Sequence, residues 1–165
     1  MEFNKPVSNP LLVGAIQLMQ AEATPEHRKM VSDEIVKAHF LSPATVTPEP
    51  EANAAGEVRL AAGSQVQFPM LSAPDGKKFF VAFTDSMELG KWKNLENQHS
   101  FSMTFDDYAG MLFKKDSKGN TSPAAGFVIN PFGANIIVPK EMVAQYLAEK
   151  MAKAQGQQPP VNPPN

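Results

Sequence analysis

The fold is decided by the stretch Phe79-Phe80-Val81-Ala82-Phe83-Thr84-Asp85. Five apolar residues in succession are typical of a β-strand that is covered on both faces, so a strand over 78–84 is predicted at the centre of a sheet. Asp85 then places a side-chain acceptor three residues before Glu88, which is the spacing of a helix capping box. We therefore expect the central strand to pass directly into a short helix that reaches Trp92.

A hairpin is predicted on the N-terminal side of this strand. Polar and apolar residues alternate over 65–70, which is typical of a strand with one buried face. The segment 73–76, with the sequence Ala-Pro-Asp-Gly, is a turn, because proline presets φ and glycine accepts a positive φ. Pro69 has no N–H group to donate, so the partner strand is expected at an edge or a bulge of the sheet.

The C-terminal side predicts a second hairpin and further helices. Thr104 to Asp107 repeats the helix-start pattern and predicts a second short helix. The β-rich runs 126–130 and 134–138 flank Pro131-Phe132-Gly133, which predicts a hairpin. Pro139 then begins an amphipathic helix that is expected to end near residue 154.

Two helices are predicted at the N-terminus. Apolar residues recur at helical spacing over 10–21, with Asn9 and Pro10 as start signals, and again over 25–39 after Thr24. The two helices are expected to form an antiparallel pair. From Ser42 to Glu57 the composition predicts a mobile connection, with no more than a short strand at either end.

Together these elements predict an α+β fold: an N-terminal helical pair, a central mixed or antiparallel sheet with two hairpins, short helices, and a C-terminal helix packed on the sheet. One domain is expected over residues 1–154. Residues 155–165 are rich in proline and glutamine and are expected to form a disordered tail.

Composition restricts the classes of function. The chain of 165 residues has no cysteine and a formal net charge of −2. The absence of cysteine removes disulfides, thiolate nucleophiles and cysteine-ligated zinc, and it favours a reducing compartment. Lysines occur in scattered pairs such as Lys77-Lys78, which argues against nucleic-acid binding. The N-terminus has no secretion-signal pattern, and the apolar stretches 11–19 and 127–138 are too short or too interrupted to span a bilayer. We therefore expect a cytoplasmic protein without nucleic-acid or membrane partners.

The quoted strand-to-helix corner, with Leu89 and Trp92 after it, and the hairpin sequence from Gly126 to Gly133 together resemble the N-terminal domain of the SseB (enhanced serine sensitivity) family. The similarity extends over roughly residues 10 to 150 in the order of its elements. It implies an α+β domain of bacterial, cytoplasmic type. It also implies no established enzymatic activity, cofactor or catalytic residues.

Groups that could carry catalysis are better explained by structure. His27 and His39 fall on one predicted helix roughly 18 Å apart and cannot share a metal ion. His99 precedes Ser100 in a polar loop, but no glycine-flanked nucleophile turn is present. Asp106-Asp107 suits the first turn of a helix, and no phosphate-binding glycine motif occurs. We expect no catalytic residues, no metal site, no cofactor and no enzymatic activity.

The corner and the second hairpin remain as candidate interaction residues. Phe132 is expected at the hairpin tip, either as an exposed contact residue or folded back over the sheet edge. The function expected is a non-catalytic binding module with an unidentified protein partner. A small-molecule-binding or regulatory domain is the alternative, and self-association through an edge strand is left open. The candidate interaction residues are Thr84, Asp85, Trp92, Asn130, Pro131, Phe132 and Gly133.

Overall fold

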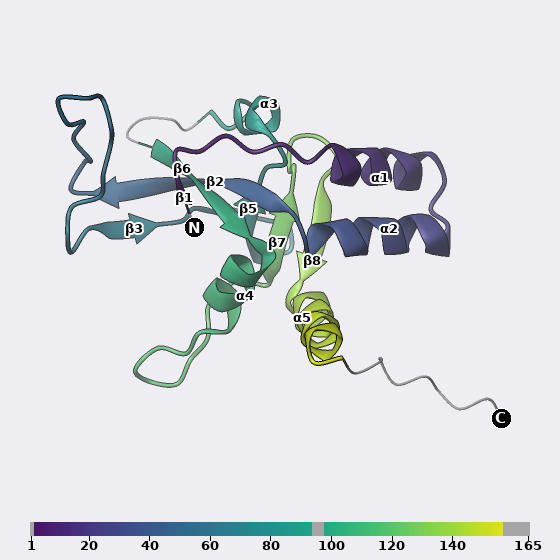
Figure 1. Ribbon diagram of the computed structural model, residues 1–165. Helices are drawn as coiled ribbons and strands as arrows, with labels where there is room; N and C mark the ends of the chain where they lie inside the picture. Colours follow the sequence, from purple (N-terminus) through teal and green to yellow (C-terminus); the bar gives the residue numbers. More distant parts are fainter. Residues whose placement is uncertain (1, 94–97, 157–165) are drawn as a thin grey trace.

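A computed structural model describes residues 2–93 and 98–156 (Figure 1). From residue 157 on, the predicted tail lies outside the described residues. The helices are α1 (Pro10–Ala21), α2 (Pro25–Ile35), α3 (Ser86–Leu89), α4 (Phe105–Phe113) and α5 (Lys140–Ala154). No helix within the described ranges is long and apolar enough to cross a membrane.

The strands form two sheets, whereas the sequence predicted one. Sheet 1 has the order β1-β6-β2-β3 and is antiparallel, and sheet 2 has the order β4-β5-β7-β8 with β5 and β7 parallel. The strands are β1 (Glu2–Phe3), β2 (His39–Thr47), β3 (Gln65–Gln67), β4 (Met70–Ser72), β5 (Lys78–Ala82), β6 (Gln98–Thr104), β7 (Gly126–Ile129) and β8 (Ile136–Pro139).

The predicted α+β class is confirmed, with the N-terminal helical pair and the packed C-terminal helix in place. The pair α1 and α2 projects beyond the sheets, whereas α5 lies against β7 and β8 (Figure 1). β5 occupies an inner position of sheet 2, and β7 and β8 form the second predicted hairpin. Local sequence signals therefore located most of sheet 2.

β2 is the main departure from the predicted elements. The region from Ser42 onward was expected to be a mobile connection, yet β2 has nine residues and lies inside sheet 1. Its start at His39 also explains why α2 ends at Ile35 rather than at residue 39. The prediction was wrong because the pairing that holds β2 comes from distant β6, not from local signals.

Pro43 is accommodated within β2 by the geometry of its neighbours. Alternate residues of a strand direct their N–H groups to the same side. Leu41 exchanges backbone hydrogen bonds of 2.8 Å with Phe83, on the side of β2 that faces away from β6. On that same side β3 begins to pair only at Thr45. Pro43 thus lies between the Leu41 bridge to Phe83 and the first residue that pairs with β3. Its missing N–H group therefore removes no sheet hydrogen bond.

β6 was predicted as a polar loop around His99 and is instead a strand between β1 and β2. Phe101 and Met103 are buried in the core and alternate with serines, which is a strand pattern that the sequence does contain. Its Thr104 forms the predicted capping box of α4 with Asp107.

The strand predicted over 65–70 is divided in two by Pro69. Gln65–Gln67 joins β2 in sheet 1, and Met70–Ser72 pairs with β5 in sheet 2. The first predicted hairpin is therefore shorter than expected, and its first strand lies at the sheet edge that the proline predicts.

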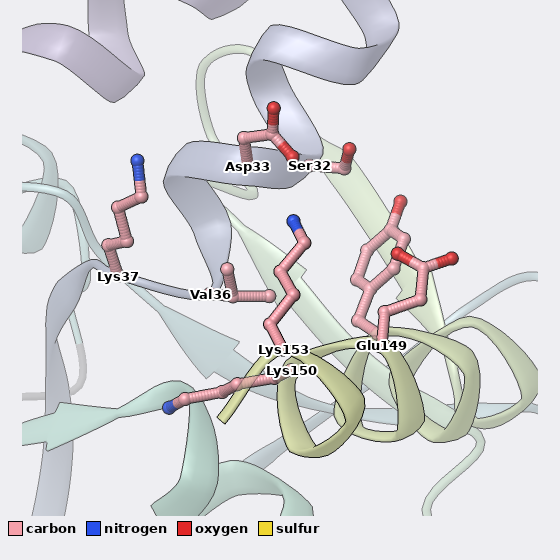
Figure 2. Close-up of a pocket in the computed structure, with 8 residues that line it drawn as sticks. Ser32, Asp33, Val36, Lys37, Glu149, Lys150 and Lys153 are labelled. Carbon is pink, nitrogen blue, oxygen red and sulfur yellow. The ribbon is translucent and has the colours of Figure 1, made fainter. Parts of the chain in front are cut away.

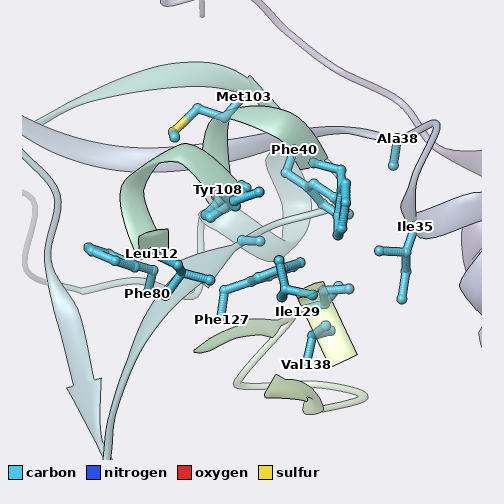
Figure 3. Close-up of a cluster of buried hydrophobic side chains, with 14 of the residues drawn as sticks. Ile35, Ala38, Phe40, Phe80, Met103, Tyr108, Leu112, Phe127, Ile129 and Val138 are labelled. Atoms are coloured by element: carbon cyan, nitrogen blue, oxygen red, sulfur yellow. The ribbon is translucent and has the colours of Figure 1, made fainter. Parts of the chain in front are cut away.

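The main hydrophobic core lies between the two sheets and α4 (Figure 3). Phe40 belongs to sheet 1 and Phe127 to sheet 2, and Tyr108 of α4 lies between them. The Tyr108 ring stacks on Phe127 at 4.7 Å and meets Phe40 edge-on at 6.0 Å. Its hydroxyl donates to the Val81 carbonyl at 2.8 Å, so the largest fully buried side chain of the described residues is also tied to β5.

A second apolar cluster covers the other face of sheet 2. Phe80 and Ala82 of β5 belong to the main core, whereas Phe79 and Val81 belong to this second cluster, as does Phe83 just after the strand. Leu89 at the end of α3 and Trp92 after it also belong to this cluster. β5 is thus buried on both faces, as its apolar sequence predicts.

We expect the fold to lose stability at alkaline pH through Tyr108. Burial raises the pKa of Tyr108 above its ordinary value of 10.0, although a hydrogen bond with Ser42 opposes this. Because the folded pKa is the higher one, the neutral hydroxyl contributes its stability below pH 10 and loses it as the pH rises further. Urea unfolding should show this decline in the wild type and a weaker one in Tyr108→Phe. At neutral pH the variant should be less stable by about 1 kcal/mol, because the hydrogen bond to Val81 is lost.

Tyr146→Phe provides the control, because the chain has two tyrosines and the variant retains only Tyr108. Ultraviolet titration of this variant should show ionisation together with unfolding. Ionisation near pH 10 in a chain that circular dichroism reports as folded would contradict the assignment.

Candidate functional site

The corner of sheet 2 is built on a reciprocal pair of hydrogen bonds. Thr84 follows β5 and Asn130 follows β7, and parallel strands end at the same edge of a sheet. The Thr84 N–H group donates to Asn130 Oδ1 at 3.0 Å, and Asn130 Nδ2 donates to Thr84 Oγ1 at 2.9 Å. Both residues are buried. Two candidate residues that are 46 positions apart are therefore joined directly.

The Thr84 hydroxyl continues this network to α3. It donates to Asp85 Oδ2 at 2.8 Å, and Asp85 Oδ1 accepts from the Glu88 N–H group at 2.9 Å. Asp85 is thus the N-cap of α3, as the sequence predicted. Its two carboxylate oxygens are both occupied within the corner.

Asn9 is a member of the corner that the sequence analysis did not identify. It was taken as the cap of α1, but its side chain makes no cap hydrogen bond. Asn9 Nδ2 instead donates to the carbonyl of Thr84 at 2.8 Å and to the carbonyl of His39 at 2.7 Å. One amide therefore connects the start of α1 with both sheets, and no local signal in the sequence marks this role.

Asn130 also shapes the hairpin that carries Phe132. Its φ of 49° lies in the left-handed region, which asparagine enters more readily than most residues. Its carbonyl accepts from the N–H groups of Gly133 and Asn135, both at 2.9 Å. The hairpin is therefore a compact, hydrogen-bonded turn with Phe132 at its tip.

Gly133 lets this turn approach α3 closely. A β-carbon at this position would lie 2.9 Å from Glu88 Oε2. Glu88 Oε1 pairs with Lys91 Nζ at 2.7 Å, whereas Oε2 is buried and has no hydrogen-bond partner in the described part of the chain. The backbone of the hairpin thus packs directly on the Glu88 side chain.

Three aromatic rings form the outer part of the corner. Phe132 stacks on Phe83 at 6.5 Å and contacts Trp92 at 6.1 Å, and Phe83 meets Trp92 edge-on at 6.3 Å. Trp92 and Phe83 are buried, while Phe132 remains 48 % exposed. The Phe132 ring therefore folds back on Phe83 and Trp92 and is still about half exposed.

Some of the candidate residues are buried and hold the corner together, whereas others are accessible to a partner. Thr84, Trp92 and Asn130 are buried, and Asp85 and Pro131 are half-buried. We define the corner surface as the accessible residues that remain, with Met87 of α3, which is 84 % exposed. The corner surface consists of Asp85, Met87, Pro131, Phe132 and Gly133.

A shallow apolar hollow of about 240 Å³ adjoins the corner surface on the outer face of sheet 2. Pro131 belongs to both, and Ile137 of β8 is exposed beside it. The hollow is lined by Leu71, Ser72, Ala73, Pro74, Phe79, Val128, Pro131, Asn135 and Ile137.

A separate hollow of about 300 Å³ lies between α2 and α5 (Figure 2). Lys153 extends from α5 toward α2 in this view. Tyr146 of α5 also lines the hollow. Burial raises the pKa of Tyr146, and a hydrogen bond with Ser32 opposes the shift. The charged residues that line this hollow include Asp33, whose carboxylate pairs with the Lys29 ammonium group at 2.7 Å.

The groups considered for catalysis do not converge. His99 Nε2 contacts Glu49 Oε1 at 2.7 Å, and His27 Nδ1 lies 2.6 Å from the Glu22 carbonyl oxygen. Asp107 acts in the capping box of α4. Within residues 2–93 and 98–156, no group of three or more histidine, aspartate or glutamate side chains is arranged to hold a metal ion.

We expect Asn130→Asp to destabilise the fold by about 2 kcal/mol at neutral pH, because a buried carboxylate would replace the amide that donates to Thr84. Urea unfolding measures this loss, which should shrink at acidic pH where the new carboxyl group is protonated. Asn135→Asp is the matched control: Asn135 also has a positive φ, of 53°, but it is exposed. The control should change stability by less than about 0.5 kcal/mol, and equal losses at both sites would contradict the role given to Asn130.

Comparison with known proteins identifies the family. The family model described as the SseB protein N-terminal domain matches residues 12–145, which is well over half of the chain and contains the corner and both of its strands. The searches of curated proteins and of solved structures return no match. The chain therefore belongs to the SseB family, through its N-terminal domain.

Proposed function

We propose that this SseB domain is a non-catalytic protein-interaction module of the bacterial cytoplasm and that the corner surface is its contact site. The single observation that carries the proposal is Phe132, an aromatic side chain half exposed at the tip of a turn. Phe83 and Trp92 support its ring from below. A ring that is already ordered loses little conformational entropy when a partner covers it, and aromatic residues dominate binding energy at protein interfaces.

The polar chemistry of the corner supports binding rather than catalysis. The Thr84 hydroxyl, the Asn130 amide and both Asp85 oxygens are used within the corner. A reacting group needs a polar atom that is free to reach a substrate. Net binding energy at the corner surface would therefore come from apolar contact, through Met87, Phe132 and the adjoining hollow.

The proposal is tested by affinity capture from an extract of the source cells, with partners quantified by mass spectrometry. Phe132→Ser and Met87→Ser should each reduce capture of a specific partner about tenfold or more, because each removes an exposed anchor. Circular dichroism must first show that Phe132→Ser is folded, since the Phe132 ring also packs on Phe83 and Trp92. Met151→Ser on α5 is the matched control, since Met151 is 54 % exposed and remote in sequence from the corner surface. A partner that all three variants retain equally would contradict the proposal.

A small-molecule-binding domain remains the second candidate, and the hollow between α2 and α5 favours it. The lining sets three lysines against the carboxylates of Asp33 and Glu149, so we infer a ligand with an anionic group for Lys153 and an apolar part against Tyr146. Thermal unfolding in the presence of carboxylate and phosphate metabolites tests this candidate. A metabolite that raises the melting temperature of the wild type, but not that of Lys153→Gln, would support it over the interaction module.

A further inference from the structure

The outer face of α1 is unlike the rest of the surface, because α1 carries no charged residue. Its twelve residues, PLLVGAIQLMQA, include no aspartate, glutamate, lysine or arginine. The neighbouring α2 has a comparable place in the projecting helical pair, and five of its eleven residues are charged at neutral pH. Apart from Gln17 and Gln20, the side chains of α1 are apolar, and large apolar side chains on a helix usually face a packed neighbour. Yet Leu11 is 71 % exposed and Leu18 is 44 % exposed.

The exposed side of α1 has the spacing of a helix-pairing seam. Leu11, Gly14, Leu18 and Ala21 follow one another at intervals of three, four and three residues, which places them along one face of the helix. Large and small side chains alternate along this face. We call these four residues the α1 seam.

Packing within the chain does not require glycine at position 14. A β-carbon at Gly14 would have no atom within 4 Å outside its own helix, so packing does not exclude a side chain. Glycine inside a helix lowers stability relative to alanine or leucine. A glycine on a helix surface permits another helix to approach closely, and this benefit requires a second helix.

We propose that the α1 seam binds the α1 seam of a second copy of this chain, in antiparallel orientation about a twofold axis. In that arrangement Leu11 faces Ala21 of the second copy, and Gly14 faces Leu18 of the second copy. Every large side chain therefore meets a small one, and the same holds in reverse by symmetry. A parallel pair would instead set each leucine against the same leucine of the second copy, and Gly14 and Ala21 each against its own copy.

The absence of charge on α1 fits this occupant. Two uncharged faces bury no unpaired ion, whereas a charged partner helix would lose hydration at the seam without compensation. The projecting position of the helical pair leaves room for a second copy (Figure 1). A helix of twelve residues is about 18 Å long, and its contact is smaller than the roughly 800 Å² per partner of a standard interface. The dimer is therefore reversible and depends on concentration.

Sedimentation velocity of the full chain over about 10 to 500 µM tests the proposal, because a reversible dimer follows mass action. The wild type should move from monomer toward dimer as the concentration rises. Leu18→Lys should weaken association at least tenfold. Met30→Lys is the matched control, since Met30 on α2 is also 44 % exposed, and it should leave association within about twofold of the wild type.

The variant Gly14→Leu distinguishes specific pairing through the α1 seam from non-specific apolar association. Leucine enlarges the exposed apolar surface, so non-specific association would become stronger. Leucine also favours the helix, so the monomer at low concentration should melt at an equal or higher temperature than the wild type. In the α1 seam the new side chain fills the space required by Leu18 of the second copy, and association should fall at least tenfold. A wild type that stays monomeric throughout, or tighter association of Gly14→Leu, would overturn the proposal.

Disulfide cross-linking tests whether the two helices are antiparallel. The chain has no native cysteine, so only the introduced cysteines can form disulfides. An oxidised mixture of Gly14→Cys and Leu18→Cys chains should form a disulfide-linked heterodimer, whereas Leu18→Cys alone should cross-link far less. The reverse result would indicate parallel helices and would overturn the antiparallel assignment.

Discussion

The hydrogen-bonded pair of Thr84 and Asn130 joins the two parallel strands of sheet 2 to the elements around them. It lies just beyond the ends of the two parallel strands, where the backbone ladder stops. Through the Thr84 hydroxyl the pair positions Asp85 at the start of α3, and through the Thr84 carbonyl it holds Asn9 at the start of α1. Since these groups are buried or half-buried and bonded to one another, loss of any one leaves a partner unsatisfied, at a cost of about 1–3 kcal/mol. A small polar cluster thereby fixes two helices, a hairpin and the junction of both sheets.

Elements with local signals could be predicted from the sequence, and elements held by distant pairing could not. β5 has an uninterrupted apolar run, and Asp85 and Thr104 have capping patterns, so each could be located without knowledge of the fold. β2 contains Pro43, which reads as a strand breaker until the position of its missing N–H group is known. That position depends on the bridge between Leu41 and Phe83, a contact across 42 residues. β6 is the intermediate case, because its alternating pattern is present in the sequence but is weak against a polar background.

The same distinction applies to the candidate site. Residue types and turn positions were sufficient to select Thr84, Asp85 and the hairpin from Asn130 to Gly133, which the fold brings together. Burial was not predictable from the same signals. Trp92 lies beside Lys91 and Lys93 in the sequence, but its ring is covered by Phe83 and Phe132. Trp92 was expected to be a contact residue, but its ring instead holds Phe132 in place.

Asn9 connects the corner surface to the α1 seam. It immediately precedes α1, and its amide is bonded to Thr84 and to His39, so the direction of the helix is fixed relative to the hairpin that carries Phe132. A dimer formed through the α1 seam would for this reason hold two corner surfaces in a constant twofold arrangement. A partner that is itself dimeric, or that repeats its binding segment, would then engage the second corner surface at high effective concentration. The fixed geometry would set that effective concentration, so avidity could exceed the affinity of a single corner surface without any new contact. The corner surface and the α1 seam would then both contribute to binding such a partner, although they share no residue.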